Sequence, residues 1–322
     1  MRSLAAARAQ LSLTQTVPRE LAHRKALGEV FVADSAELGS DEFLVAIQIP
    51  RAHSLWFDRR APYHDALALV EASRQGSFVL MHRHLGVPIG LPFTLHRVDF
   101  QVIDLEAFRD DYATPLEAIY HARLHDRQVR GDVLIGMTLR ADLVITGAPA
   151  ATLSGEIAFL PQREYDAMRA VQRARLPDAR ARQPLRRVDP ARVGRIDSRN
   201  VVVGETDGPP RDNGEAFYPL VVDERHPSFY DHPQDHVPGP LLIEAYRQAA
   251  ILTAQSAGAL PSPVAAVMRC DATFGEFCEP EAPAMCSAAV MATSDGRVSL
   301  SVGLHQFDRR IADARIELKS YP

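Results

Sequence analysis

The sequence contains almost no lysine: only Lys25 and Lys319 occur, so nearly all of its 36 cationic side chains are arginines. Cysteine is also scarce, with Cys270, Cys278 and Cys286 and no CxxC pair. This set argues against a disulfide framework and a zinc site, and it fits buried thiols in a reducing cytoplasm. No run approaches the roughly 18 apolar residues of a membrane span. The net charge of −5 argues against a general nucleic-acid binder. We therefore expect a cytoplasmic protein without metal or other cofactor that binds neither nucleic acid nor membrane.

An internal repeat is present. At 322 residues the chain is about twice the usual domain length, and residues 53–75 align without a gap to residues 226–248, 173 positions later. Seven of the aligned positions are identical: His53/His226, Asp58/Asp231, Leu69/Leu242, Glu71/Glu244, Ala72/Ala245, Arg74/Arg247 and Gln75/Gln248. After a shift of one residue, His96–Asp99 also aligns with Met268–Asp271. The sequence therefore predicts a duplicated domain.

Each copy combines strand-like and helical periodicity. Alternating apolar residues over 43–49, 134–145 and 298–304 predict strands. Two helices are predicted from residues that share one face, namely Leu67, Val70, Arg74, Ser77, Phe78 and Met81 in the first copy, and Ile243, Arg247, Ala250, Ile251 and Ala254 in the second. The pattern indicates an α+β fold in which each half is a long helix wrapped by a curved antiparallel sheet.

The expected domains are residues 1–161 and 193–322, joined by a linker over residues 162–192. The linker is rich in arginine and is broken by Pro177, Pro184 and Pro190. Two interpretations are open. The segment is either a solvated helix and loop, or a docking surface for an acidic partner such as an acyl carrier protein.

The second copy begins its helix with a Pro-Gly pair. The Gly239 amide would lie at the positive end of the helix dipole, where it can hold a thioester carbonyl and stabilise the oxyanion formed on attack. Pro240 has no N–H, so it cannot contribute a donor.

Further along the same helix, Glu244, Arg247 and Gln248 project from one side. They are either a surface ion pair or a buried catalytic set. A buried carboxylate would have its pKa raised towards the working range of a general base, with the arginine limiting the shift. The first copy repeats the pattern in Glu71, Arg74 and Gln75.

The histidines distinguish the two copies. His236 immediately precedes the second helix, and Tyr63 replaces it in the first copy. His53 and His226 have structural and functional interpretations that remain equally open. A metal site formed by His232, Asp235 and His236 is not favoured, because no fourth ligand is evident.

The segment FYDHPQDHVPGPLLIEAYRQAA resembles the signature of the AfsA-type A-factor biosynthesis family, the γ-butyrolactone and butenolide synthases. Residues 17–24 with 29–32 resemble the family's N-terminal signature, and residues 193–195 leading to 200–203 resemble its second-domain opening. Two departures are Pro240 and Ala66, where a methionine and a proline are expected.

The resemblance implies a tandem double hot-dog fold. It also implies that a β-ketoacyl thioester on acyl carrier protein condenses with dihydroxyacetone phosphate, giving an ester that cyclises to a butenolide phosphate. We expect Glu244 to be the principal base and Arg247 the phosphate ligand, with Glu71 and Arg74 as a second set. The other expected site residues are His236 and Gly239 for catalysis, and Gln248, Gln75, Asp231 and Asp235 for substrate binding. The sequence is compatible with two oligomeric states, a monomer in which the two halves form a pseudo-dimer and a homodimer.

Two other functions remain open. One is a 3-hydroxyacyl-thioester dehydratase or thioesterase on the same fold, with His232 or His236 beside the helix carboxylate. The Arg-Gln pair argues against it, because a neutral acyl substrate gives no reason for a buried arginine. The other is a non-catalytic acyl or lactone sensor, which the lack of a recognisable helix-turn-helix segment disfavours.

Overall fold

The computed structural model describes residues 8, 10–176, 185–206, 208 and 210–321. Two of the helix breakers expected in the linker, Pro177 and Pro184, lie outside these residues. The chain forms two compact units. The first contains Met1–Phe57 and Pro62–Tyr165, and the second contains Asp58–Ala61 and Asp166–Pro322. The short segment Asp58–Ala61 therefore belongs to the second unit although it lies within the first repeat.

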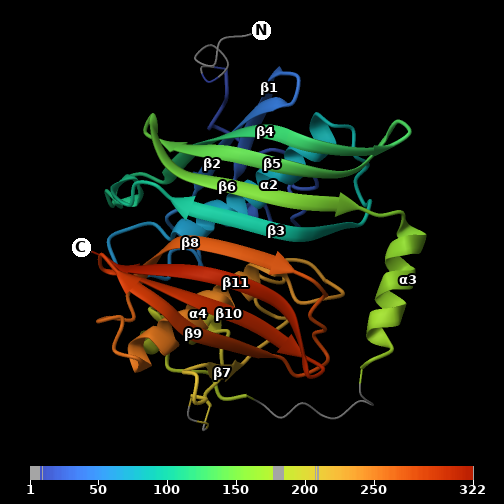
Figure 1. Cartoon of the computed structure of the whole chain (residues 1–322). Coiled ribbons are helices and arrows are strands. Elements are labelled where there is room, and N and C mark those ends of the chain that lie inside the picture. Colours follow the sequence, from blue (N-terminus) through green and yellow to red (C-terminus); the bar gives the residue numbers. More distant parts are fainter. Residues whose placement is uncertain (1–7, 9, 177–184, 207, 209, 322) are drawn as a thin grey trace. The chain divides into compact units, whose positions relative to one another are not determined.

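The first unit has one long helix, α2 (Ala66–Arg83), and a six-stranded antiparallel sheet with the strand order β1-β2-β4-β5-β6-β3 (Figure 1). Its strands are β1 (Val32–Gly39), β2 (Glu42–Ile49), β3 (Phe93–Val102), β4 (Leu116–Arg130), β5 (Val133–Ile145) and β6 (Ala148–Phe159). Short 3₁₀ turns lie at η1 (Leu27–Glu29) and η2 (Glu106–Phe108).

The second unit repeats this plan with the helix α4 (Gly239–Ser256) and the strand order β8-β11-β10-β9-β7. Its strands are β7 (Ala216–Pro219), β8 (Ala265–Phe274), β9 (Met285–Ser294), β10 (Arg297–Gln306) and β11 (Arg309–Ser320). The turns η3 (Pro190–Val193) and η4 (Ser198–Asn200) precede them, and α3 (Gln162–Arg173) connects the two repeats.

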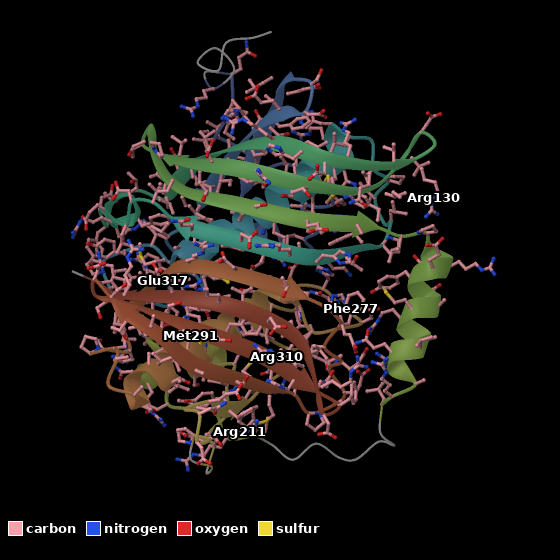
Figure 2. All side chains as sticks on the ribbon, in the orientation of Figure 1. Arg130, Arg211, Phe277, Met291, Arg310 and Glu317 are labelled. Carbon is pink, nitrogen blue, oxygen red and sulfur yellow. The ribbon has the colours of Figure 1, made fainter. Side chains whose placement is uncertain are left out.

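The expected strands and helices are confirmed. The alternating residues Val298, Leu300, Val302 and Leu304 are all buried on β10, so one face of this strand forms core. Figure 2 shows Met291 on β9 and Arg310 and Glu317 on β11, and Met291 is exposed. An apolar inner face and a mixed outer face are typical of an antiparallel sheet that covers a helix on one side. The α+β architecture thus follows from the strand pattern.

The two long helices differ from the expected single apolar stripe. Fifteen of the 18 residues of α2 and fourteen of the 18 residues of α4 are buried. A helix that is buried on nearly every side lies in the interior. Polar side chains such as Gln75 and Gln248 are consequently enclosed as well, and each needs hydrogen-bond partners.

The segment expected as a linker contributes to the second unit. Residues from Asp166 onward belong to that unit, and the polar side chains Arg169 and Gln172 of α3 are buried. This part of the segment is therefore not a merely solvated spacer. Among the described residues, no helix is long and apolar enough to cross a bilayer.

The later part of the repeat is also confirmed in the strands. Arg97 and Asp99 form an ion pair on β3, and Arg269 and Asp271 form the equivalent pair on β8. The N···O distances are 2.7 and 2.6 Å. Both copies therefore retain the same short-range polar contact at the same place on equivalent strands.

Candidate functional site

Glu244 lies at the centre of a fully engaged ion cluster on α4. Its side chain is completely buried and accepts five N–H bonds. Arg195 donates through Nε and Nη2 at 3.0 and 2.9 Å, and Arg247 donates through Nε and Nη2 at 2.9 and 2.6 Å. Gln248 donates the fifth bond at 2.5 Å. This carboxylate is thus paired with two guanidinium groups.

The expected rise in the pKa of Glu244 is wrong. Burial by itself raises this pKa, but the charges of Arg195 and Arg247 and their hydrogen bonds lower it to about 2. A carboxylate that is ionised and has both oxygens occupied is a poor proton acceptor. The cluster therefore suits a structural role better than that of a general base.

Arg195 reaches Glu244 because of the glycine before it. Gly194 has a φ of 72°, and a Cβ at this position would lie 2.7 Å from the Pro263 carbonyl oxygen. Any larger residue would therefore be strained and would clash. The Val193-Gly-Arg195 sequence thus directs the arginine towards α4.

The first unit contains the same cluster around Glu71. Arg24 and Arg74 both pair with this buried carboxylate, and Gln75 donates to it at 2.8 Å. Burial raises the pKa of Glu71, but Arg24 and Arg74 lower it to about 2. Its expected catalytic role meets the same objection as that of Glu244.

The two clusters differ in the arginine that lies on the same helix as the glutamate, Arg247 in α4 and Arg74 in α2. All three nitrogens of Arg247 are engaged, two by Glu244 and Nη1 by the Val193 carbonyl at 3.2 Å. Arg74 uses Nε and Nη2 on Glu71, and its side chain is 27% exposed over the ring of Phe78. Among the described residues nothing binds Nη1 of Arg74. Arg247 is therefore poorly suited to bind a phosphate, whereas Arg74 keeps a donor for an anion.

The two glutamines attach each helix to an extended segment of its own unit. Gln248 accepts from the Val202 amide and donates to the Asn200 carbonyl, at 2.9 and 2.7 Å. Gln75 makes the equivalent bonds with Phe31 and Glu29, both at 2.9 Å. These side chains complete backbone hydrogen bonds, so their expected role in substrate binding has no support in these contacts.

His226 and His53 have structural contacts. The Nδ1 of His226 accepts the amides of Ser228 and Phe229, so Nε2 carries the proton and donates to Asn200 at 2.9 Å. His53 similarly accepts two backbone amides and contacts Glu29. Both histidines therefore hold local loop structure.

The N-terminus of α4 is open. Pro238 is the N-cap, and no side chain caps the helix. Gly239 provides the first helical amide, which lies before the first intrahelical bond. A Cβ placed on Gly239 would meet nothing within 4 Å. Among the described residues, no hydrogen bond occupies the Gly239 amide, so this donor at the positive end of α4 is uncapped.

The N-terminus of α2 is closed by its own sequence. Asp65 occupies the position equivalent to Pro238, and its Oδ1 accepts the Leu67 amide at 3.1 Å. Tyr63, the counterpart of His236, is buried and donates to Glu106 at 2.6 Å while accepting from Arg109 at 2.6 Å. The first copy therefore has a carboxylate cap where the second has a free amide.

His236 and Asp235 form a hydrogen-bonded pair just before α4. The distance between His236 Nδ1 and Asp235 Oδ1 is 2.7 Å. Because a carboxylate only accepts, Nδ1 carries the proton, and Nε2 of the neutral ring is left as an acceptor. Among the described residues nothing binds this Nε2, and the side chain is 28% exposed. The pair has the arrangement of an oriented histidine base.

The remaining predicted residues lie away from this arrangement or are enclosed. The side chain of Asp231 is buried, with one oxygen 3.5 Å from Nδ1 of His232. A side chain that is this buried is not accessible to substrate, so the expected substrate-binding role of Asp231 has no support in its position. Among the described residues, no three His, Cys, Asp or Glu side chains are grouped to hold a metal ion.

Four functional candidates were not identified from the sequence. Arg24 and Arg195 lie in the opening segments that resemble the family, 171 residues apart, and this near-repeat could have identified them. Arg169 binds Asp235, 66 residues away, and Glu279, 110 residues away, and no motif marks Arg169 or Glu279.

Comparison with known proteins supports the duplication. Residues 5–161 and 177–321 match the family described as AfsA, the A-factor biosynthesis hotdog domain. A protein of Streptomyces virginiae named 2-oxo-3-(phosphooxy)propyl 3-oxoalkanoate synthase is 32% identical over 300 residues, which cover 93% of this chain and 96% of that protein. A protein of the same name from Streptomyces griseus is 29% identical and covers 79% of this chain and 80% of its own length.

Solved structures share the fold. A thioesterase structure from Novosphingobium aromaticivorans has a TM-score of 0.52 at 12% identity, covering 89% of this chain and 98% of that chain. An oleoyl thioesterase structure from Lactobacillus plantarum has a TM-score of 0.52 at 11% identity, covering 92% and 100%. At these identities the likeness concerns the fold alone. With two matched segments and two helix-and-sheet units, the chain belongs to the AfsA family of A-factor biosynthesis hotdog proteins and has a double hot-dog fold.

Proposed function

We propose that this chain transfers a 3-oxoacyl group from the thioester of an acyl carrier protein to a hydroxyl of dihydroxyacetone phosphate. The product is the ester named in its relatives, a 2-oxo-3-(phosphooxy)propyl 3-oxoalkanoate. The observation that carries the catalytic part of this proposal is the Asp235–His236 pair beside the open amide of Gly239. This combination provides a base and an oxyanion donor within one short segment.

In the transfer step, Nε2 of His236 removes the proton from the attacking hydroxyl group. The hydroxyl oxygen bonds to the thioester carbon, and the negative charge that develops on the carbonyl oxygen is stabilised by the Gly239 amide and the helix dipole. When the tetrahedral intermediate collapses, the C–S bond breaks and the thiolate takes the proton from the imidazolium. Ester and free thiol are formed, and the histidine returns to its neutral form.

Closure to a butenolide phosphate is the second part of the proposal. The methylene between the two carbonyls of the ester loses a proton to His236. Its carbon then attacks the ketone carbon of the triose unit, which forms a five-membered ring. Loss of water gives the butenolide. The relatives' name ends at the open ester, so this step requires its own measurement.

The arginine-bound glutamates have a different role in this proposal. Glu244 and Glu71 hold α4 and α2 in place, and the base role passes from Glu244 to His236 because Glu244 is ionised and saturated. Arg247 is not the phosphate ligand in this proposal, because all three of its nitrogens bind groups of the protein. Asp235 orients His236 and does not bind substrate itself.

The test is a reaction with defined substrates. The protein is incubated with a synthetic 3-oxoacyl thioester, with and without dihydroxyacetone phosphate, and the products are analysed by mass spectrometry. We expect the phosphorylated ester only when the triose phosphate is present, and a later mass loss of one water if the ring closes on the enzyme. Simple hydrolysis of the thioester, or water loss from a 3-hydroxyacyl thioester, would instead indicate a thioesterase or a dehydratase.

A further inference from the structure

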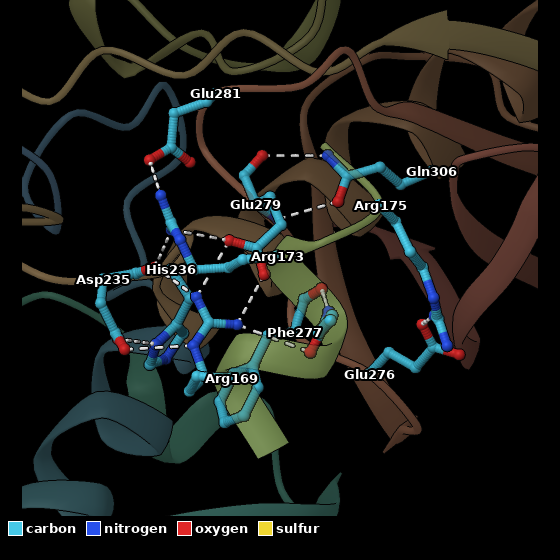
Figure 3. A network of polar contacts seen from close by, with 11 residues as sticks. Arg169, Arg173, Arg175, Asp235, His236, Glu276, Phe277, Glu279, Glu281 and Gln306 are labelled. Carbon is cyan, nitrogen blue, oxygen red and sulfur yellow. Dashed lines mark hydrogen bonds and ion pairs between the residues drawn. The ribbon is translucent and has the colours of Figure 1, made fainter. Parts of the chain in front are cut away.

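We propose that Arg169 on α3 is a positioning residue, which fixes Asp235 so that His236 presents Nε2 to the substrate. This inference rests on the proposed function, because it assigns to α3 the orientation of the base. Figure 3 shows Arg169 reaching both Asp235 and Glu279 from α3. The segment that resembled a linker thus supports the reacting side chain without touching the substrate.

Arg169 binds Asp235 at two points. Its Nε donates to Oδ2 of the carboxylate at 3.1 Å, and its Nη2 donates to the backbone carbonyl of the same residue at 2.6 Å. With Oδ2 and the carbonyl both bound, rotation of the Asp235 side chain is restricted. The other oxygen, Oδ1, is then available for Nδ1 of His236. One arginine therefore determines which oxygen the histidine binds.

Arg169 is itself held from the opposite side. Its Nη1 and Nη2 donate to the two oxygens of Glu279, at 2.6 and 2.9 Å, and Glu279 is completely buried. The backbone of Glu279 is bonded in turn to the side chain of Gln306 on β10, through N–H at 2.8 Å and through the carbonyl at 2.9 Å. A continuous series of hydrogen bonds thus links β10 to His236.

Phe277 contacts the side chains of both Arg169 and His236. The guanidinium carbon of Arg169 lies 4.7 Å from the centre of the Phe277 ring, and the His236 ring lies 4.5 Å from it. An aromatic face stabilises a nearby cation, so Phe277 favours the position of Arg169 and limits the tilt of the imidazole. These contacts explain why a charged side chain of α3 is buried in this unit.

A buried arginine could be needed only for folding, so the experiment separates the two roles. Arg169→Gln removes the contacts to Asp235 and leaves Glu279 with Arg173 as its remaining cation. The double variant Arg169→Gln/Glu279→Gln removes both members of the buried pair, so no uncompensated charge remains, while the two bonds from Arg169 to Asp235 are still lost. Arg175→Gln is the matched control, because Arg175 pairs with Glu276 just beyond α3 and contacts neither Asp235 nor His236.

Two quantities are measured on the full-length variants. The first is the tautomer of His236 in the substrate-free protein, from the ¹⁵N chemical shifts of its ring. The wild type and Arg175→Gln should carry the proton on Nδ1, and both Arg169 variants should show a mixture of tautomers. The second is kcat for ester formation, which we expect to fall by about 10- to 100-fold in both Arg169 variants, with KM nearly unchanged.

The outcomes are distinct. An unchanged tautomer in Arg169→Gln, or full kcat in the double variant, would overturn the positioning role and leave Arg169 as part of a folding contact. If the wild type forms no ester, the proposed function fails, while the tautomer measurement still decides whether Arg169 orients His236.

Discussion

The two long helices carry the same buried ion cluster but begin differently. In α2 and α4 the glutamate, arginine and glutamine occupy equivalent positions, and an arginine from an earlier segment completes each set. At their N-termini, Asp65 caps α2, whereas Pro238 leaves the amide of Gly239 uncapped. The comparison separates two functions. The features that the halves share hold each helix in its unit, and the features that only the second half has are suited to catalysis.

The largest effect is expected on stability, from substitution of the buried glutamate that both halves share. Replacing Glu244 by Gln leaves Arg195 and Arg247 buried without their counter-charge, which costs about 3–5 kcal/mol of the free energy of unfolding. Glu71→Gln should destabilise in the same direction. Urea unfolding measures the loss, and the folded fraction of Glu244→Gln should still form ester. A Glu244→Gln protein of wild-type stability without activity would instead show that this carboxylate is the base.

The difference between the two helix N-termini is removed most directly by giving α4 the aspartate cap of α2. Pro238→Asp places a carboxylate where Asp65 stands in the first copy, so its side chain competes with the developing oxyanion for the helix N-terminus. We expect kcat to fall by about 10²-fold, the usual cost of losing one oxyanion donor, without loss of stability. Steady-state kinetics and thermal unfolding check both parts. Pro238→Ala is the control, because it changes the backbone without adding an acceptor.

The helix arginines Arg74 and Arg247 should respond differently. Arg74→Gln removes a partly exposed guanidinium, and we expect it to cost only about 1 kcal/mol of the free energy of unfolding. Arg247→Gln should cost more, because all three of its nitrogens bind groups of the protein and its side chain is buried. Urea unfolding of the two variants measures the difference. Equal losses would show that the exposure of Arg74 has no effect on the stability of its cluster.

The smallest effect concerns acid. The pKa values of Glu71 and Glu244 are about 2 in the folded protein, compared with 4.5 ordinarily. The stability that they contribute is present above pH 4.5 and is lost as the pH falls towards 2, because the unfolded chain takes up protons first. At pH 4 the contribution of each carboxylate to the free energy of unfolding should already be about 1 kcal/mol smaller than at pH 7. Unfolding of the wild type and of Glu244→Gln between pH 7 and 4 should therefore show the shallower pH dependence in the variant, and equal slopes would argue against the low pKa.

Much of the fold was predictable because it depends on local periodicity. The alternation over Val298–Leu304 and the Pro-Gly start of α4 identify strand and helix without knowledge of distant residues. The complete burial of both helices was not predictable from an apolar stripe. It depends on polar residues such as Gln248, which are satisfied by backbone groups far away in the sequence.

The membership of the site remains a prediction, and the contacts that decide the roles of its residues are not contained in the motif. Glu244, His236 and Gly239 were singled out from one motif, but the roles of the first two depend on contacts that the motif does not contain. Arg195 reverses the expected pKa shift of Glu244, and Asp235 fixes the proton of His236. The partner Arg169 lies 66 residues from Asp235 in a segment of ordinary composition, so only the structure brings it to the site.

In this account His236, just before α4, is the catalytic base, and Tyr63, at the equivalent position before α2, has no catalytic role. The most direct measurement is kcat/KM for ester formation in His236→Tyr, which copies the first half into the second, beside Tyr63→Phe as its matched control. We predict a fall of about 10²- to 10⁴-fold in His236→Tyr, the range for loss of a general base, and nearly wild-type activity in Tyr63→Phe. A folded His236→Tyr protein with wild-type kcat/KM would contradict the account.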